Sequence, residues 1–242
     1  MINFFRKKRK TLANENKALK YTRYAIGEIV LVVIGILIAL QLNTWNEGRK
    51  QKALEIDILK EVKNGLISDL DDANYNLNAN KKKYSSQNLI ISWLESDLIY
   101  NDTLSTHFSE ISYGTYFASN KGPYQTLKQL GMRTIKNDSL RNQISKLYEL
   151  KYEQYNVYNE EYKKLNYLMF PGYSKYFNEI SYYELNMKPT DIVGLKKDNE
   201  FSFALKTTKN FNVILINSTI PEVILEINKT LTMINNEIDS IE

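Results

Sequence analysis

The chain has 242 residues, and its hydrophobic content of 43% is enough for one sizeable core. It contains no cysteine, which excludes disulfides, thiolate metal sites and cysteine nucleophiles. Its only histidine is His107, and a histidine zinc site needs more than one. We therefore expect no metal site and place His107 at the surface or at a helix cap. The low content of Gly (9) and Pro (4) favours long helices over frequent tight turns.

The formal net charge of +4 is distributed unevenly. Residues 1–24 contain one acid, Glu15, and eight bases: Arg6, Lys7, Lys8, Arg9, Lys10, Lys17, Lys20 and Arg23. This segment carries +7, which leaves −3 for the remainder, so we expect no nucleic-acid partner for the domain. We interpret Arg6, Lys7, Lys8, Arg9 and Lys10 as facing anionic lipid. A docking tail for a cytoplasmic partner is the alternative.

A long apolar run follows this basic segment. Residues 25–42 read AIGEIVLVVIGILIALQL, and only Glu28 and Gln41 interrupt the apolar and small residues. Tyr24 and Trp45 bracket the run, at a separation of roughly 32 Å along an α-helix. This length matches a hydrocarbon core of about 30 Å with an aromatic anchor at each interface.

We therefore predict that residues 25–45 form an uncleaved transmembrane helix that lies in the lipid bilayer. The run is long for the apolar part of a signal peptide, and no Ala-x-Ala cleavage pattern follows it. The basic residues on its N-terminal side predict that residues 1–24 are cytoplasmic and that residues 46–242 are exported. In a bacterium with two membranes, this is an inner-membrane protein with a periplasmic domain.

Glu28 lies within the predicted span, where an ionisable group is a functional hypothesis. It shares a helical face with Gly35 and Ala39, and these two residues form a small-xxx-small pattern that permits close helix approach. We interpret Glu28, Gly35, Ala39 and Gln41 as the small and polar residues of a helix–helix interface. Two alternatives stay open: a glutamate held near the interface by water and head groups, and a group that takes up protons or ions.

The exported domain is predicted to be an all-α bundle, and the spanning helix is expected to continue into it. Residues 47–83 form a helix with apolar positions every three or four residues. These positions are Leu54, Ile58, Val62, Leu66, Leu70, Ala73 and Leu77. A second helix is predicted over residues 85–99. Its core candidates are Leu89, Trp93 and Leu94.

Shorter elements are predicted next. Residues 103–111 form a short helix, and residues 114–122 are irregular. Pro123 opens another helix at its first turn, and Gly131 ends it.

The clearest pattern begins at Asp138 and runs about 30 residues to Pro171. It follows a heptad stripe in which only Lys151 breaks the sequence of apolar and aromatic residues. The stripe consists of Leu140, Ile144, Leu147, Tyr155, Tyr158, Tyr162, Leu165 and Met169. We interpret its tyrosines as core residues with hydroxyls near water. A platform for a sugar or another ring is the alternative.

The C-terminal third is predicted to be helical with one loop. Residues 173–185 form a helix, residues 189–199 form a loop, and a helix resumes near Glu200.

Pro221 is expected to kink or restart this helix, with Ser218 or Thr219 as a cap. Three heptads follow: Ile220, Ile224, Ile227, Leu231, Ile234, Ile238 and Ile241. This seam must pack on another helix, and the pattern leaves open whether that helix belongs to the same chain.

No pattern typical of catalysis or cofactor binding is present. The sequence has no Gly-rich phosphate loop, no dinucleotide fingerprint, no His-Glu-x-x-His and no Gly-x-Ser-x-Gly. The acidic groups Asp69, Asp71, Asp72, Glu160 and Glu161 are predicted to lie on solvated helix faces. A glycosidase would need two carboxylates that converge in a cleft. We expect no enzymatic activity and no cofactor.

Two stretches resemble a known family. The first is Tyr-Ala-Ile-Gly-Glu-Ile-Val-Leu-Val-Val-Ile-Gly and the residues after it, over 24–41, with Asn43 and Trp45-Asn46-Glu47. The second comprises Tyr124, Leu127, Gly131, Ile135-Lys136-Asn137-Asp138, Leu140-Arg141, Ile144 and Tyr148. Together they resemble an uncharacterised single-span membrane-protein family common in Bacteroidota, although Thr44 departs from the expected Asn. The resemblance implies an inner-membrane protein with a periplasmic helical domain, and it implies no activity.

Three functions are compatible with these features. The first is a structural or interaction subunit that self-associates or joins a larger envelope complex. The second is a ligand-sensing helical module, which would need a partner because a 24-residue tail holds no output domain. The third is an accessory subunit of an ion-driven or transport complex, with Glu28 as the coupling group.

Overall fold

The computed structural model describes residues 18–180 and 184–242, with side chains from Thr22 onward. The predicted lipid-facing residues Arg6–Lys10 lie outside this part. The chain divides into two compact units, Met1–Leu54 and Glu55–Glu242. The described part is all-α, as predicted, and contains no strand beyond an isolated bridge between Phe177 and Pro189.

The first element is α2, a single helix over Ala18–Leu94. The helix predicted over residues 47–83 is thus confirmed. The prediction of a separate helix over residues 85–99 is wrong, because α2 continues without a break to Leu94. No Pro or Gly occurs between residues 66 and 94, so nothing in the backbone ends the helix near Tyr84.

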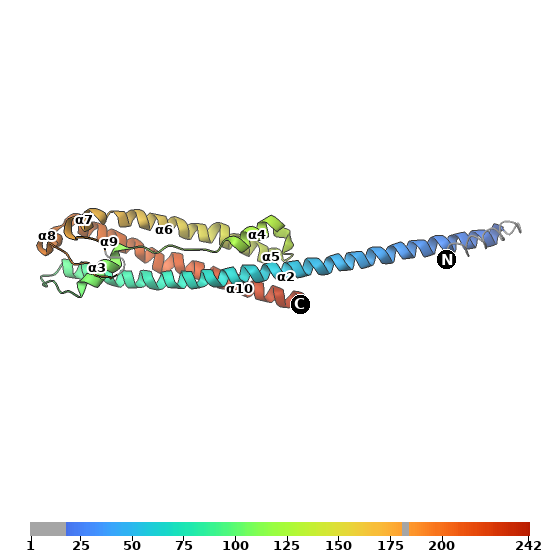
Figure 1. Cartoon of the computed structure of the whole chain (residues 1–242), viewed down its shortest axis with the longest axis horizontal. Coiled ribbons are helices and arrows are strands. Elements are labelled where there is room, and N and C mark those ends of the chain that lie inside the picture. Colours follow the sequence, from blue (N-terminus) through green and yellow to red (C-terminus); the bar gives the residue numbers. More distant parts are fainter. Residues whose placement is uncertain (1–17, 181–183) are drawn as a thin grey trace. The chain divides into compact units, whose positions relative to one another are not determined.

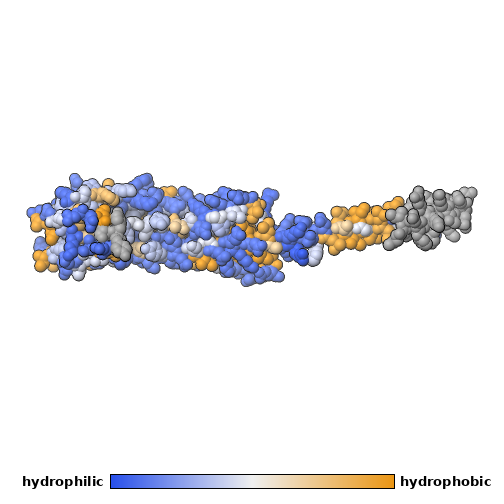
Figure 2. All heavy atoms as spheres, viewed as in Figure 1, coloured by the Kyte–Doolittle hydropathy of each residue, from blue (hydrophilic) through white to orange (hydrophobic). Residues whose placement is uncertain are grey.

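In the first unit, α2 is exposed along nearly its whole described length. The large apolar side chains between Ile26 and Leu42 are 46–64% exposed. Figure 2 shows this segment as a mostly orange surface. One helix in the described part is therefore long and apolar enough to cross a membrane.

The second unit contains three long helical segments. The first is the part of α2 from Glu55 onward. The second joins α5 (Asp138–Ser145), the π-helical segment η2 (Lys146–Lys151) and α6 (Tyr152–Tyr167). The third joins α9 (Asn199–Ile214), the π-helical segment η3 (Leu215–Thr219) and α10 (Ile220–Ile241). The first two run in the same direction and the third runs back (Figure 1).

The short helices lie at the two ends of this bundle (Figure 1). At one end are α3 (Leu104–Ser112), α7 (Phe170–Tyr176) and α8 (Ile192–Lys197). At the other are α4 (Gly122–Leu130) and the 3-10 turn Met132–Thr134. Residues 113–121 connect the two ends as a non-helical segment, so an extended chain takes the place of a fourth helix.

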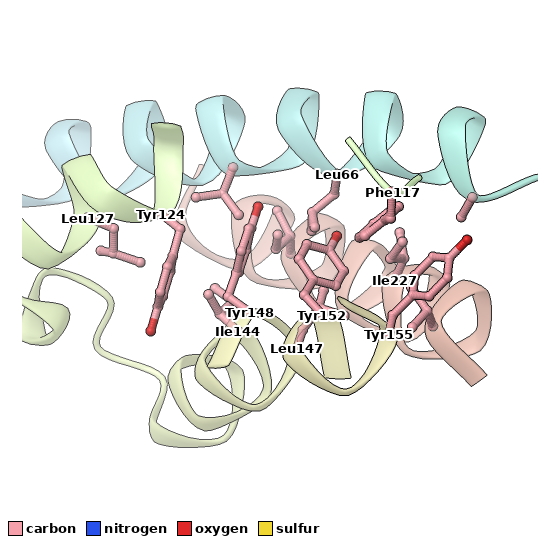
Figure 3. Close-up of a cluster of buried hydrophobic side chains, with 14 of the residues drawn as sticks. Leu66, Phe117, Tyr124, Leu127, Ile144, Leu147, Tyr148, Tyr152, Tyr155 and Ile227 are labelled. Carbon is pink, nitrogen blue, oxygen red and sulfur yellow. The ribbon is translucent and has the colours of Figure 1, made fainter. Parts of the chain in front are cut away.

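Two hydrophobic clusters fill the bundle. One joins α2, α4, α5, α6 and α10, and Figure 3 shows its tyrosine rings between the helices. The other joins the end of α2 to α3, α7, α8 and α9. The tyrosine ring stacking includes Tyr124 on Tyr148, with centroids 4.5 Å apart. Tyr155 and Tyr162 are core residues, as predicted, but their hydroxyls are buried as well, so the expectation that these hydroxyls lie near water is wrong.

The C-terminal heptads pack within the chain. Ile220, Ile227, Ile234 and Ile238 are buried in the first cluster, and Ile224, Leu231 and Ile241 are packed against it. The structure therefore answers the question that the heptad pattern left open.

The two π-helical segments change the predicted register. The predicted buried face passes through Lys151 and Tyr158. In the structure, Tyr148 and Tyr152 are buried and Tyr158 is exposed. A π turn holds an extra residue, so η2 rotates the face of the following helix relative to the preceding one. This rotation explains the gap in the heptad pattern at Lys151.

Pro221 neither ends the helix nor restarts it with a cap. The chain passes from η3 directly into α10, and neither Ser218 nor Thr219 caps the helix through its side chain. The π segment directly before Pro221 is where the regular hydrogen-bond pattern is interrupted, since proline lacks the N–H group that α-helix bonding needs.

The region between α6 and α9 departs most from the predictions. The helix expected over residues 173–185 is α7, which begins earlier and ends at Tyr176, and the expected loop over 189–199 contains α8. Asp191 caps α8 through the Gly194 N–H, and Asp198 caps α9 through the Phe201 N–H. These two aspartates are N-cap signals that mark the start of α8 and of α9 in the sequence.

Candidate functional site

A polar stripe runs along the buried face of α2, between the two hydrophobic clusters. The stripe continues the three-to-four spacing of the apolar positions along α2. Because the helix is unbroken, the same spacing buries Gln87 and Ile90, and the predicted core residue Leu89 is exposed. Leu54 is exposed as well. The stripe consists of Asp69, Asp72, Asn76, Asn80 and Lys83, of which all except the half-buried Asp72 are buried.

The polar stripe binds the extended segment 113–121 along its length. Two aspartates accept from its backbone: Asp69 Oδ1 from the Asn120 N–H (2.6 Å) and Asp72 Oδ2 from the Ala118 N–H (3.0 Å). Two asparagines donate to it: Asn76 Nδ2 to the Tyr116 carbonyl (2.9 Å) and Asn80 Nδ2 to Thr115 Oγ1 (2.9 Å). Lys83 Nζ donates to the Tyr113 carbonyl. These side chains supply the hydrogen bonds that a neighbouring strand would otherwise supply. The prediction that Asp69 and Asp72 lie on a solvated face is therefore wrong, whereas Asp71 is exposed.

A cavity of about 550 Å³ lies beside this polar stripe. Its walls are α2, the end of α3 and the start of the extended segment. The lining residues that carry charge are Asp72, Lys82, Lys83 and Glu110. Tyr75, Tyr113 and Tyr116 supply ring faces, so the cavity combines charged groups with aromatic surface.

Lys83 is the most unusual residue of the cavity because only 3% of it is exposed. Its Nζ lies 5.0 Å from the centroid of the Tyr162 ring and 5.8 Å from that of Tyr113. No carboxylate within the described ranges forms an ion pair with it. Burial lowers the pKa of Lys83 to about 7, because removal from water penalises the ammonium form.

The neighbouring charges form a compact group around Glu110. Lys82 Nζ lies 2.5 Å from Glu110 Oε1, Ser86 Oγ donates to Oε2, and His107 Nδ1 lies 3.7 Å from the same oxygen. Although its own burial opposes the shift, the hydrogen bonds from Lys82 and Ser86 hold the pKa of Glu110 below its ordinary value. His107 belongs to this group, and its side chain is 31% exposed, so it lies only partly at the surface.

This group does not have the geometry of a hydrolytic triad. Ser86 Oγ and Glu110 both contact Nδ1 of His107, whereas a triad places the serine and the acid on different imidazole nitrogens. Glu110 and Asp72 also line one cavity, as a glycosidase would require of two carboxylates. A general acid needs a raised pKa, and that of Glu110 is lowered instead. The arrangement is better suited to binding than to acid catalysis.

The residues predicted for the membrane segment lie on α2 in the first unit. Seven and eleven residues separate Glu28 from Gly35 and Ala39, so the three share one helical face. A side chain at Gly35 would meet nothing within 4 Å. Gln41 lies thirteen residues after Glu28, roughly 140° around the helix, and the helix does not bring it to that face.

The two predicted interface anchors are both exposed. Tyr24 is 42% exposed and Trp45 is 65% exposed. The guanidinium of Arg49 lies over the Trp45 ring, 5.5 Å from its centroid, one helical turn away. An aromatic–basic pair at this position is typical of the boundary of an apolar span.

One known family matches residues of both units of the chain. A model described as a family of unknown function, DUF6090, matches residues 28–208, well over half of the sequence. The chain belongs to the DUF6090 family. The DUF6090 match begins at Glu28 and includes both the apolar run, except its first three residues, and the cavity residues on α2. No curated protein and no solved structure matches this DUF6090 chain.

Sequence patterns do not predict this cavity, for a definable reason. Asn76, Asn80 and Lys83 continue the heptad positions of Ala73, but polar residues at such positions do not by themselves predict burial. The signal was present as a polar interruption of an otherwise unbroken helix pattern. Its meaning depended on Glu110 and Tyr113, which only the tertiary fold brings next to α2.

Proposed function

We propose that this chain is a membrane-anchored interaction subunit of a bacterial inner membrane, of the kind found in Bacteroidota. The observation that carries the proposal is the exposed apolar surface of α2 between Ile26 and Leu42. An apolar surface of this extent is not stable in water, and lipid or another apolar helix must cover it.

The basic residues before α2 support an orientation with the N-terminus in the cytoplasm and the bundle in the periplasm. Because the chain has no cysteine, single cysteines report topology cleanly. We expect Ser240→Cys to react with a membrane-impermeant maleimide in cells with a permeabilised outer membrane, and Thr11→Cys to react only after lysis. Reaction of Thr11→Cys in intact spheroplasts would rule out this orientation.

Self-association through the face of Glu28, Gly35 and Ala39 is the second part of the proposal. Small residues on this face allow two helices to approach closely. Native mass spectrometry of the full-length chain, extracted gently from its own membrane, measures the assembly directly. We expect a homo-oligomer or a stoichiometric complex with a second protein.

A matched pair of substitutions tests this face. Gly35→Leu should disrupt the assembly, because the added side chain keeps the helices apart, whereas Val30→Leu on the opposite face should leave it intact. Glu28→Gln should preserve an assembly in which Glu28 only donates or accepts hydrogen bonds. Loss of function with intact assembly would instead favour the coupling role of an accessory subunit in an ion-driven complex.

The bundle also offers a surface for a partner. Leu98, Ile99 and Val193 are 67%, 90% and 64% exposed at the end where α8 lies. Lys196 of α8 donates to the carbonyls of Ser96 and Leu98, which holds the two segments together. An exposed apolar group of this kind supports docking to another envelope protein.

A ligand-sensing module is the second candidate function, and the cavity on α2 favours it. The cavity size lies within the range of small-molecule sites, and charged and aromatic groups converge in it. A sensor would pass its signal through a partner protein. A thermal shift of the full-length chain in the presence of a ligand would support this candidate.

A further inference from the structure

The cavity contains the buried amine of Lys83, and no carboxylate among the described residues forms an ion pair with it. Lys83 Nζ donates to the Tyr113 carbonyl, which uses one of the three donors of an ammonium group. A buried ammonium is stable only where a counter-charge or further hydrogen bonds compensate for lost hydration. Within the described ranges, Lys83 has no ion-pair partner, so the cavity it lines is the place from which a counter-charge can come.

The other charged groups of the cavity are already engaged. Lys82 is paired with Glu110, which also accepts from Ser86 and lies beside His107. Asp72 accepts from Asn76 and from the Ala118 N–H. It precedes Lys83 by eleven residues, roughly 16 Å of rise along α2, so the two side chains start from different turns of the helix.

Aromatic surface lies next to this amine. The Tyr113 and Tyr162 rings lie against Nζ, and the exposed rings of Tyr75 and Tyr116 line the rest of the cavity. Tyrosine rings of this kind stack on flat apolar groups. The volume of about 550 Å³ is typical of sites that enclose a small organic molecule.

We infer that this cavity binds a small organic carboxylate with a ring-shaped apolar part, with its carboxylate paired to Lys83 and its ring against Tyr75 and Tyr116. The inference deepens the ligand-sensing candidate by naming the ligand class and the residue that recognises it. It does not depend on self-association, which the Gly35→Leu measurement tests separately.

A purely structural role for Lys83 makes a different prediction. If Lys83 only holds the extended segment to α2, its replacement changes stability and leaves carboxylates and neutral analogues indistinguishable. If Lys83 recognises an anion, the charge of the probe decides whether it binds. The comparison of a charged and an uncharged probe of the same shape therefore separates the two roles.

The experiment is fluorine NMR of para-fluorobenzoate and its neutral counterpart para-fluorobenzamide with the full-length chain in nanodiscs. We expect the benzoate signal to broaden at probe concentrations up to about 10 mM, a range suited to a ligand of this size, and the benzamide signal to stay sharp. Lys83→Met should weaken benzoate binding at least about tenfold. Lys175→Met removes a lysine that also lies over an aromatic ring, outside the cavity, and should leave benzoate binding unchanged.

The dependence on pH supplies a second readout. Binding requires the ammonium form, so benzoate affinity should fall about tenfold between roughly pH 6 and pH 8 in the wild-type chain and in His107→Gln. Equal binding by Lys83→Met, equal binding of benzamide, or no benzoate binding near pH 6 would each overturn the inference. None of these outcomes bears on whether the anchor assembles.

Discussion

Two aspartates separated by one residue on α2 have opposite environments. Asp69 is fully buried and accepts from the Asn120 N–H and from the Tyr152 hydroxyl, whereas Asp71 is exposed. Although both hydrogen bonds favour its ionised form, burial raises the pKa of Asp69 above its ordinary value. The carboxylate is thus retained at an energetic cost because it accepts from the buried Tyr152 hydroxyl and from the Asn120 N–H.

Asp69→Ala should lower the free energy of unfolding by about 1–3 kcal/mol, because the buried Tyr152 hydroxyl loses its acceptor and the Asn120 N–H loses its bond to α2. Asp71→Ala should change it by less than about 0.5 kcal/mol. Urea titration of the full-length chain in nanodiscs, followed by the fluorescence of the buried Trp93 in a Trp45→Phe background, measures both. Equal effects of the two substitutions would contradict the assignment of Asp69 to the core.

Lys83 gives a pH dependence of stability with a definite sign. Its folded pKa of about 7 lies below the unfolded value, so between these values the unfolded chain binds more protons and stability rises with pH. The full cost of burying the charge is present below about pH 7 and decreases as the pH rises. The buried tyrosines act in the opposite direction only above about pH 10, where unfolded tyrosines ionise.

We expect the free energy of unfolding to increase by about 2 kcal/mol between roughly pH 7 and pH 9, since each pH unit contributes at most about 1.4 kcal/mol for one proton. Lys83→Met should remove this increase, and Lys196→Met should retain it. Denaturant titrations at several pH values measure the slope. A slope that persists in Lys83→Met would assign the dependence to another group.

At the level of elements, the extended segment 113–121 depends on α2 for its hydrogen bonds. Asn76 is buried and bonds both to Asp72 and to the Tyr116 carbonyl. Asn76→Ala should therefore release the middle of this segment. Relative to the wild-type chain, amide hydrogen exchange should become faster in residues 114–120 and stay unchanged in α6. Asn74→Ala is the matched control, because Asn74 is exposed and bonds only within α2. Uniform exchange in Asn76→Ala would show that the apolar contacts of Phe117 suffice.

The elements that could be predicted from the sequence are those with strong local signals. Apolar spacing predicted α2 as far as residue 83 and the long C-terminal helices, Pro123 and Gly131 bounded α4, and Asn137 caps α5. The register after η2 could not be predicted in this way. A single extra residue in a helical turn leaves no mark in composition, yet it decides whether Tyr152 or Tyr158 is buried.

At the scale of the whole molecule, the anchor and the bundle have separate requirements. Ile34→Arg combined with Leu37→Arg places two charges near the centre of the apolar run, at a cost of about 2.5–3.5 kcal/mol each for membrane insertion. We expect the double variant to leave the membrane fraction while Trp93 fluorescence still reports a folded bundle. Ile34→Val with Leu37→Ile is the matched control and should stay in the membrane fraction. Retention of the double-arginine variant after a carbonate wash would contradict the membrane-anchor proposal.

The sequence by itself determined the helical class, the apolar run of α2 and most of the apolar core, because helical periodicity and composition are local properties. The polar stripe from Asp69 to Lys83 is also present in the sequence, but no local pattern indicates that it is buried. Only the tertiary structure decided that this stripe is buried, that the C-terminal heptads pack within the chain and that Lys83, Glu110 and Tyr113 share one cavity. The physical reason is that burial, electrostatic partners and pKa shifts depend on segments far apart in the sequence, and no local pattern specifies which of them meet.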